Sequence, residues 1–372
     1  MLGLKRLRNF GAKLKTATQS NIDDKPLGRL SNDDVVAAFR WLMGREPGSQ
    51  AIIDGYSAET PARLIEDFAR SPEFHKRWKT SPYYYFHSSL DVEGIIRAHE
   101  NPGRASKPGH LVNFLGVAMN IAFMPLMAEH GGKVEGLPIP ANWHAEMAEF
   151  AAALRAVDLA RDRFTMIELG CGWGCWMNNT GAAARRRGLT VHLIGVEGDE
   201  GHIGFAREAL ATNGMDTEDY TLWRGIAGPR SGTALFPRQN QSGEHWGLEP
   251  KFDLPPDARA ELLAGGRYDE LAVLALADIV GAEQRIDLLH MDIQGGEADF
   301  VRDCMPTLLE RVAYLVIGTH SRAIEGRLMT DLADAGWVLE IERPSDFTIT
   351  DSGPFTTMDG IQGWRNPRLV SL

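Results

Sequence analysis

From residue 141 onward, short apolar runs alternate with amphipathic stretches. The apolar runs predict strands at 165–169, 191–197, 220–226, 286–293, 313–319, 337–342 and 355–364. Apolar residues at helical spacing predict helices at 143–159, 176–187, 199–212, 271–280, from 297 onward and at 323–335. Strands that alternate with helices pair in parallel through right-handed crossovers. We therefore predict an α/β, Rossmann-like fold with a seven-stranded, mostly parallel sheet and helices on both faces.

The first part of the chain has a different pattern. Short helical patterns with polar starts and glycine or proline breaks predict a small all-helical domain at 31–78. Residues 1–30 are expected to be a basic tail and linker, and residues 79–140 a connection and candidate lid. The sheet domain is expected to span 141–372.

Two stretches do not fit the alternation. The apolar run 111–128 is interrupted by Asn113, Asn120 and Pro125, and it falls short of the ~20 residues that a bilayer span needs. We expect a buried helix or an active-site cover there. Residues 228–266 are an insertion with several prolines. It is too long for a plain connection and is predicted to be functional or an edge embellishment.

The first predicted strand of this domain runs into Glu168-Leu169-Gly170-Cys171-Gly172-Trp173-Gly174. Glycine at every second position lets a ligand approach the backbone and permits the positive φ angles of a tight strand-to-helix turn. The spacing differs from the Gly-x-Gly-x-x-Gly of dinucleotide enzymes. A helical stretch follows at once and stops at Gly188. This glycine loop is therefore predicted to bind a ligand.

Other polar residues fall at the predicted strand ends. The second strand ends at Glu197-Gly198, about twenty residues beyond the loop, where a ribose diol would be held. His290 and Asp292 lie on one face of the fourth strand, and His320 follows the fifth. Ligands of open parallel sheets bind where the strand order reverses. If the order reverses between the first and fourth strands, Asp292 lies beside the glycine loop.

Composition narrows the function further. The 372 residues are 44% hydrophobic and 24% charged, as in a globular protein, with a net charge of -11 and a pI near 5.5. Wrapping of nucleic acid depends on neutralising phosphates, so a neutral or cationic small substrate, or a glycan, fits better than nucleic acid. Three cysteines form no disulfide framework and indicate a reducing, cytoplasmic setting.

The N-terminus is basic and amphipathic over residues 1–15, without a long apolar core or a cleavage site. It is not a secretion signal. A solvated tail is favoured over a weak contact with an anionic membrane surface, and we expect no transmembrane segment.

The glycine loop resembles the first motif of class I S-adenosylmethionine-dependent methyltransferases, and Glu197 matches their ribose-binding acid. The resemblance implies S-adenosyl-L-methionine as the cofactor. It also implies the cofactor-binding residues Glu168, Gly170, Cys171, Gly172, Trp173, Gly174, Glu197, Gly198 and Asp292.

More narrowly, residues 287–297, residues 317–321 and Gly336-Trp337 resemble the FkbM methyltransferase family. This resemblance implies O-methylation of a sugar, glycan or polyketide-like acceptor. Gln294 departs from the pattern, because many relatives have Glu there. The insertion 228–266 is a second departure, and it prevents a direct transfer of acceptor preference.

The chemistry requires an acceptor oxygen held in line with the methyl group, exclusion of water and a base for the hydroxyl proton. His320 is our first candidate for the base, because an imidazole can be neutral near pH 7, and His290 is the second. Asp292 is expected to orient the base, bind the acceptor or touch the methionine moiety. An alternative is a divalent metal held by His290, Asp292, Glu297 and His320. It is not favoured, because no tight ligand motif is present.

Two rival functions remain. A nicotinamide-dependent oxidoreductase could use the same half-site, but the glycine spacing argues against it. A non-catalytic nucleotide-binding adaptor for glycan enzymes is the other rival. It is suggested by residues 42–47 and 71–74, which resemble a short helical domain of unknown function appended to bacterial glycan-handling enzymes. No pattern identifies the acceptor, the hydroxyl attacked or the oligomeric state.

Overall fold

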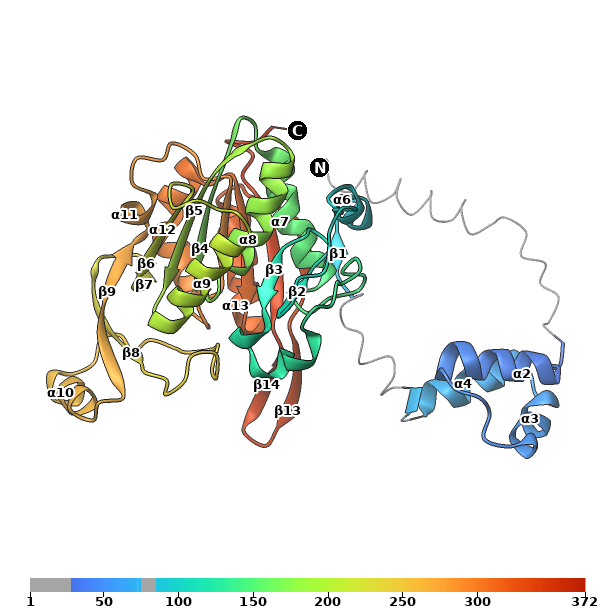
Figure 1. The fold of residues 1–372 in the computed structure, drawn as a ribbon. Helices are drawn as coiled ribbons and strands as arrows, with labels where there is room; N and C mark the ends of the chain where they lie inside the picture. Colours follow the sequence, from blue (N-terminus) through green and yellow to red (C-terminus); the bar gives the residue numbers. More distant parts are fainter. Residues whose placement is uncertain (1–27, 72, 75–84, 372) are drawn as a thin grey trace, which may run out of the picture. The chain divides into compact units, whose positions relative to one another are not determined.

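The computed structural model describes residues 28–71, 73–74 and 85–371 (Figure 1). The chain divides into two compact units, residues 1–81 and 82–372, which we describe separately. The predicted basic segment at 1–15 lies outside the described residues. Within the part of the chain that is described, no helix combines the length and the apolar character needed to cross a membrane.

The first unit is built from short helices around a small apolar core. Its elements are α2 (Asn32–Ala38), the π-helical turn η1 (Phe39–Met43), α3 (Gln50–Ser57) and α4 (Pro61–Arg70). Its buried core consists of Val35, Phe39, Met43, Leu64 and Phe68. Helix α2 begins after a capping box. The Ser31 side chain accepts a hydrogen bond from the Asp34 N–H, and the Asp34 carboxylate accepts one from the Ser31 N–H. The helices agree with the sequence pattern, and the domain limits of 31–78 stay a prediction.

The second unit contains an eight-stranded sheet in the order β1-β12-β15-β11-β10-β4-β5-β6. The strands are β1 (His87–Ser88), β12 (Val338–Arg343), β15 (Gly360–Arg365), β11 (Tyr314–Thr319), β10 (Leu288–Met291), β4 (Arg163–Leu169), β5 (Thr190–Glu197) and β6 (Tyr220–Arg224). The five strands from β11 to β6 are parallel, whereas β15 is antiparallel to both of its neighbours. The α/β prediction is therefore correct.

The predicted number of seven strands is wrong, because β1 adds an eighth. His87 and Ser88 pair antiparallel with Glu342 and Ile341 of β12. Two residues without an apolar run give no strand signal of their own. The strand forms because its backbone pairs with the edge strand β12.

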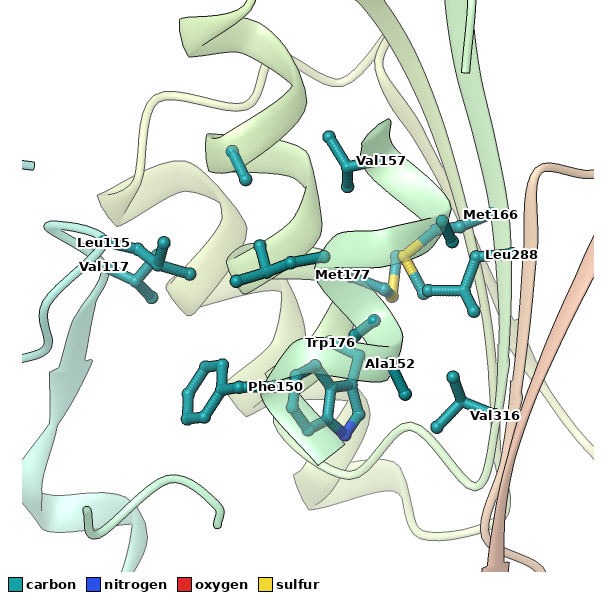
Figure 2. Packing of buried hydrophobic residues seen from close by; sticks show 14 of the residues in the cluster. Leu115, Val117, Phe150, Ala152, Val157, Met166, Trp176, Met177, Leu288 and Val316 are labelled. Carbon is teal, nitrogen blue, oxygen red and sulfur yellow. The ribbon is translucent and has the colours of Figure 1, made fainter. Parts of the chain in front are cut away.

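Two helical layers cover the sheet, as Figure 1 shows. One layer holds α7 (Met147–Leu159), α8 (Cys175–Arg186) and α9 (Glu200–Thr212), and the other holds α11 (Leu276–Val280), α12 (Glu297–Arg311) and α13 (Arg322–Asp334). In Figure 2, Phe150 of α7 and Trp176 and Met177 of α8 pack in the same cluster as Met166 of β4 and Leu288 of β10. This packing fixes the start of α8 against the ends of the central strands.

The helix predicted at 271–280 is wrong in its first half. Residues Tyr268–Ala275 form strand β9, and only Leu276–Val280 form a helix. Leu271 and Val273 are buried while Ala272 between them is exposed, which is the alternation of a half-buried strand. The alanines favoured a helix by propensity, but pairing with two neighbouring strands decides the conformation.

That pairing creates a second, three-stranded sheet in the order β7-β9-β8. Strand β7 (Ile226–Gly228) is the end of the stretch that we predicted as one strand at 220–226, and β8 (Gly232–Pro237) lies in the insertion. The insertion also contains α10 (Pro256–Ala264). It is therefore folded and is attached to the main sheet through the chain that leaves β6.

The buried helix expected at 111–128 is also wrong. The stretch forms a hairpin of β2 (His110–Val112) and β3 (Ala118–Asn120), followed by the 3-10 turns η3 (Ile121–Phe123) and η4 (Pro125–His130). Asn113 Oδ1 accepts from the N–H groups of Leu115 and Val117 and so closes the turn. Most of its large apolar side chains are buried or half-buried, as expected, but Leu126 is 67% exposed.

The last predicted strand, 355–364, is two strands. Residues up to Met358 belong to β14 (Gly353–Met358), which pairs with β13 (Asp346–Thr350) in a separate hairpin, and only Gly360 onward enters the main sheet. Between the two, the buried Glu325 carboxylate and the Thr319 hydroxyl lie so close to Gly360 that a side chain there would overlap them. The break occurs at this glycine.

Candidate active site

A cavity of about 680 Å³ opens at the carboxyl ends of β4, β5 and β10. The sheet order reverses between β4 and β10, because the chain proceeds outward from β4 on one side and from β10 on the other. Of the eleven site residues proposed from the sequence, nine line the cavity, and Gly174 and His320 do not. The nine are Glu168, Gly170, Cys171, Gly172, Trp173, Glu197, Gly198, His290 and Asp292.

The glycine loop has the backbone that its sequence predicts. Gly170, Gly172 and Gly174 have φ angles of 74°, 52° and 75°. A Cβ atom on Gly170 would overlap the carbonyl oxygen of Asp292, and one on Gly172 would lie 3.1 Å from the Trp246 ring. The loop is therefore enclosed between β10 and the insertion, and Gly174 is the N-cap of α8.

Glu168 fixes the helix that follows the loop. Its two carboxylate oxygens accept from the N–H groups of Trp176, at 3.2 Å, and Met177, at 2.9 Å. These donors have no partner within the helix, and a carboxylate at a helix N-terminus satisfies them. Burial raises the pKa of Glu168 to about 7, against the opposing charge of His290 and the two N–H groups. Glu168 thus sets the geometry of the loop as well as lining the cavity.

Glu197 joins the ends of the first two strands. Its Oε2 accepts from the Gly172 N–H at 2.9 Å, and its Oε1 accepts from the Asp199 N–H at 2.8 Å. Each carboxylate oxygen can accept a second hydrogen bond. At the next residue, a Cβ on Gly198 would lie 2.6 Å from the Phe236 ring. The predicted ribose-binding acid therefore stands at the cavity, oriented by backbone donors.

Asp292 lies beside the glycine loop, as the reversal of strand order predicts. Its N–H donates to the Leu169 carbonyl at 3.0 Å. Oδ1 accepts from Gln294 Nε2 at 2.8 Å and lies 3.2 Å from His320 Nε2. Burial opposes ionisation, but His320 outweighs it and lowers the pKa of Asp292. Gln294 adopts a positive φ of 59°, so this turn is shaped to bring its amide onto Asp292.

His320 was predicted to act as a neutral base, but its surroundings disfavour that role. His320 does not line the cavity, and its ring stands between two carboxylates, with Nε2 near Asp292 and Nδ1 3.0 Å from Glu297 Oε1. Burial alone would lower its pKa, but the hydrogen bonds and charges of Asp292 and Glu297 raise the pKa to about 10. These surroundings favour the protonated ring, which has no free nitrogen lone pair with which to accept a proton.

His290 has the environment expected of a base. It lines the cavity, and its Nε2 lies 3.1 Å from Glu149 Oε1. Its Nδ1 is buried without a hydrogen-bond partner among the described residues. Burial lowers the pKa of His290, but Glu149 and the further charges of Glu168 and Asp292 outweigh it and raise the pKa overall. Trp176 stacks at a tilt of 31° against the ring, with centroids 5.4 Å apart.

The sequence analysis missed Glu149 and Trp246. Glu149 is the one acid in the first two turns of α7, where its neighbours are apolar and buried. An isolated acid on such a helix is a signal that could have been used. Trp246 lies in the insertion and stacks on His202, with ring centroids 4.2 Å apart and planes at 7°. No local pattern links it to the glycine loop.

The cavity wall is acidic. Its carboxylates are Glu149, Glu168, Glu197, Asp253, Asp292, Asp299 and Asp303, and none of the described residues that line it is Lys or Arg. Burial raises the pKa of the Cys171 and Cys175 thiols, which keeps them protonated.

Three of the four candidate metal ligands meet. One potential ligand atom from each of Asp292, Glu297 and His320 lies within 4.8 Å of the other two. The fourth, His290, faces Glu149 instead. In the described arrangement each nitrogen of His320 faces a carboxylate, which is the geometry of ion pairs. The metal alternative stays open and is not favoured.

We compared the chain with protein families, with solved structures and with known sequences. No model of a protein family matches it. Among solved structures, the methyltransferase domain of METTL16 lacking its N-terminus has a TM-score of 0.35 at 13% identity, covering 66% of this chain and 94% of that chain. Precorrin-6y C5,15-methyltransferase from Geobacter metallireducens has a TM-score of 0.31 at 11% identity, covering 58% and 86%. Scores this low carry no argument.

The sequence comparison is decisive. A protein from Jannaschia sp. (strain CCS1), described as "Putative methyltransferase", is 42% identical over 275 residues. The match covers 74% of this chain and 98% of that protein. The chain belongs to the same methyltransferase family as this protein.

Proposed function

We propose that the chain is an S-adenosylmethionine-dependent O-methyltransferase that acts on a hydroxyl of a sugar, glycan or related small molecule. The observation that carries the proposal is the cavity at the reversal point between β4 and β10, where the glycine loop, Glu197 and Asp292 meet. On the motifs at 287–297 and 317–321 we further propose an FkbM-type enzyme, and on the three free cysteines a cytoplasmic setting.

The residues present fit the donor. A cavity of about 680 Å³ lies within the range typical of small-molecule sites. The glycines keep side chains away from the floor, and Glu197 offers two oriented oxygens for a ribose diol. Trp246 and His202 stack face to face and both line the cavity, so a purine ring can extend this aromatic stack. When bound, S-adenosylmethionine supplies a methyl group on a sulfonium, which is electrophilic without further activation.

The acidic wall argues for the acceptor class. Phosphate-bearing acceptors are bound chiefly by Lys and Arg, and neither residue type occurs among the described residues that line the cavity. Asp299 and Asp303 are paired with Arg302, whereas Glu149 and Asp292 have histidines, His290 and His320, as their partners. Hydroxyl and ammonium groups donate hydrogen bonds to carboxylates, so a neutral or cationic acceptor fits.

We propose His290 as the base in place of His320. If Nε2–H donates to Glu149, the lone pair of Nδ1 is free to accept the hydroxyl proton. As that proton moves to Nδ1, the oxygen–carbon bond forms and the carbon–sulfur bond breaks. Glu149 is then a positioning residue, because it fixes the tautomer and stabilises the imidazolium that forms.

The experiment that tests the acceptor class is a transfer of labelled methyl groups from S-adenosylmethionine. The protein is incubated with neutral oligosaccharides, with amino sugars and with RNA in parallel. We expect label in the carbohydrate samples. The labelled methyl group should stay bound after mild acid or base, as expected of a methyl ether. Label in RNA alone would contradict the proposal, and the nicotinamide rival predicts no transfer to any sample.

A further inference from the structure

Glu297, His320 and Asp292 form a chain of alternating charges that ends at the cavity. Glu297 is fully buried, and its Oε1 accepts from the N–H groups of Ile293, at 3.2 Å, and Gly295, at 3.0 Å. His320 Nδ1 lies 3.0 Å from that oxygen, and His320 Nε2 lies 3.2 Å from Asp292 Oδ1. The positive imidazolium is thus held between a fixed carboxylate and a carboxylate at the cavity.

The two oxygens of Asp292 have different surroundings. Oδ1 takes both interactions, one from Gln294 Nε2 and one from His320. Within the described residues, no hydrogen bond or ion pair is recorded for Oδ2. The side chain is 45% exposed and lines the cavity. Oδ2 is therefore a free hydrogen-bond acceptor that a bound molecule can reach.

We propose that Asp292 Oδ2 binds an ammonium or hydroxyl group at the reactive end of the cavity, and that His320 and Glu297 are positioning residues that hold this carboxylate in its orientation. The inference rests on the proposed methyl-donor site, because it places the reactive end at the loop that Asp292 contacts. Neither His320 nor Glu297 lines the cavity. Their influence on a ligand must pass through Asp292.

The chain of charges explains three features that are otherwise unconnected. An ionised carboxylate at a partly buried position is stabilised by a cation, and His320 supplies it. A cation at His320 needs a second anion, because only one of its nitrogens faces Asp292, and Glu297 supplies that. Gln294 adds a neutral donor, whereas a glutamate there would set a like charge 2.8 Å from Asp292 Oδ1.

The ligand class follows from this arrangement. An ionised carboxylate oxygen accepts hydrogen bonds and cannot donate them, so it selects groups with N–H or O–H and repels anions. A hydrogen bond to a charged group is stronger than one between neutral groups. An ammonium should therefore bind next to Asp292 more tightly than a hydroxyl or a bare thioether.

The test uses two probes that share the donor's adenosine and amino-acid parts. S-adenosylhomocysteine has a neutral thioether at the reactive end, whereas sinefungin carries an amine there. Calorimetric titration of the full chain gives the ratio of their two affinities. We expect the native protein to prefer sinefungin by roughly ten-fold, the size expected for one hydrogen bond to a charged group.

The variants separate positioning from general damage. Asp292→Asn should reduce the preference to about one, and His320→Gln and Glu297→Gln should reduce it in part. In the two positioning variants, the affinity for S-adenosylhomocysteine should stay within roughly three-fold. The exposed Asp334→Asn is the matched control and should keep the native ratio. A purely structural role would weaken both probes together and leave the ratio unchanged.

The outcomes are distinct. An unchanged preference for sinefungin in Asp292→Asn overturns the inference and leaves the methyl-donor site intact. An unchanged ratio in both His320→Gln and Glu297→Gln overturns the positioning roles. Binding of neither probe by the native protein contradicts this inference and the proposed function together. If the buried Glu297→Gln fails to fold, the partly exposed Asp292 still decides the result.

Discussion

Gly170 and Asp292 are in backbone contact, although 121 positions separate them in the printed sequence. A Cβ atom on Gly170 would overlap the Asp292 carbonyl oxygen, and the Asp292 N–H donates to the Leu169 carbonyl at 3.0 Å. This contact joins the first half of the cavity, which comes from consecutive elements, to the second half, which comes from β10, the turn after it and α12. It determines where any bound molecule meets the Asp292 carboxylate.

Gly170→Ala should therefore damage both stability and ligand binding. The matched control is Gly188→Ala, because Gly188 also has a positive φ, of 82°, but a Cβ there would meet no atom within 4 Å. The control should lower the free energy of unfolding by about 1 to 2 kcal/mol, the cost of the left-handed backbone alone. Gly170→Ala should cost more and should weaken S-adenosylhomocysteine binding. Denaturant unfolding and calorimetry measure the two effects, and equal losses in both variants would contradict the contact.

His290→Ala should lower the rate of methyl transfer without loss of donor binding. Removal of a general base typically costs about 10²- to 10⁴-fold in rate. Glu149→Gln should cost less, because the ring keeps its nitrogen but loses the carboxylate that stabilises its protonated form. His87→Ala, at an exposed position on β1, is the control. Single-turnover kinetics with saturating donor would measure the step, and a native rate in His290→Ala would remove His290 from the mechanism.

Trp246→Ala tests whether the insertion is part of the donor site. Loss of the aromatic stack that Trp246 forms with His202 should weaken S-adenosylhomocysteine binding about three- to ten-fold, in line with the stacking energy of aromatic pairs. Trp223→Ala is the control, because Trp223 is 45% exposed on β6 and does not line the cavity. If both variants bind as tightly as the native protein, the insertion acts elsewhere, for example on the acceptor.

Glu135→Gln should raise stability only at higher pH. Burial raises the pKa of Glu135 to about 7, against one hydrogen bond from the Trp143 N–H. Between its unfolded pKa and about 7, the folded state binds a proton that the unfolded state has lost, so stability falls as pH rises through this window. Glutamine does not ionise, so the variant does not lose stability in this way as the pH rises. Thermal unfolding should give similar midpoints for both proteins at about pH 5 and a higher midpoint for the variant at about pH 8. A higher midpoint at low pH alone would contradict the assignment.

The structure of the glycine loop, which we propose binds the donor, was predictable because its signals are local. The loop 168–174, the helix that stops at Gly188 and the acid Glu197 all lie within one strand–helix–strand unit, whose geometry its sequence determines. The position of Asp292 followed from one topological rule about the reversal of strand order. That rule depends only on the sequence of strands and helices, which the apolar pattern reveals.

The remaining features depend on contacts between distant segments. His320 was chosen as a base for its intrinsic pKa, but Glu297 and Asp292 reverse its expected protonation state. Glu149 reaches His290 only because α7 crosses β10, and Trp246 reaches Gly172 only because the insertion folds back over the loop. The stretch 271–280 was misread because a short apolar run with alanines has no clear period until a partner strand fixes it.

The central claim is that the cavity binds the methyl donor through the glycine loop and Glu197. Calorimetric titration of S-adenosylhomocysteine and of NAD tests it in the native protein, in Glu197→Gln and in the exposed control Glu200→Gln, three residues further on. We predict binding of S-adenosylhomocysteine but not of NAD by the native protein and the control, and at least about ten-fold weaker binding by Glu197→Gln. Binding of NAD in place of S-adenosylhomocysteine, or equal affinity in Glu197→Gln, would contradict the account.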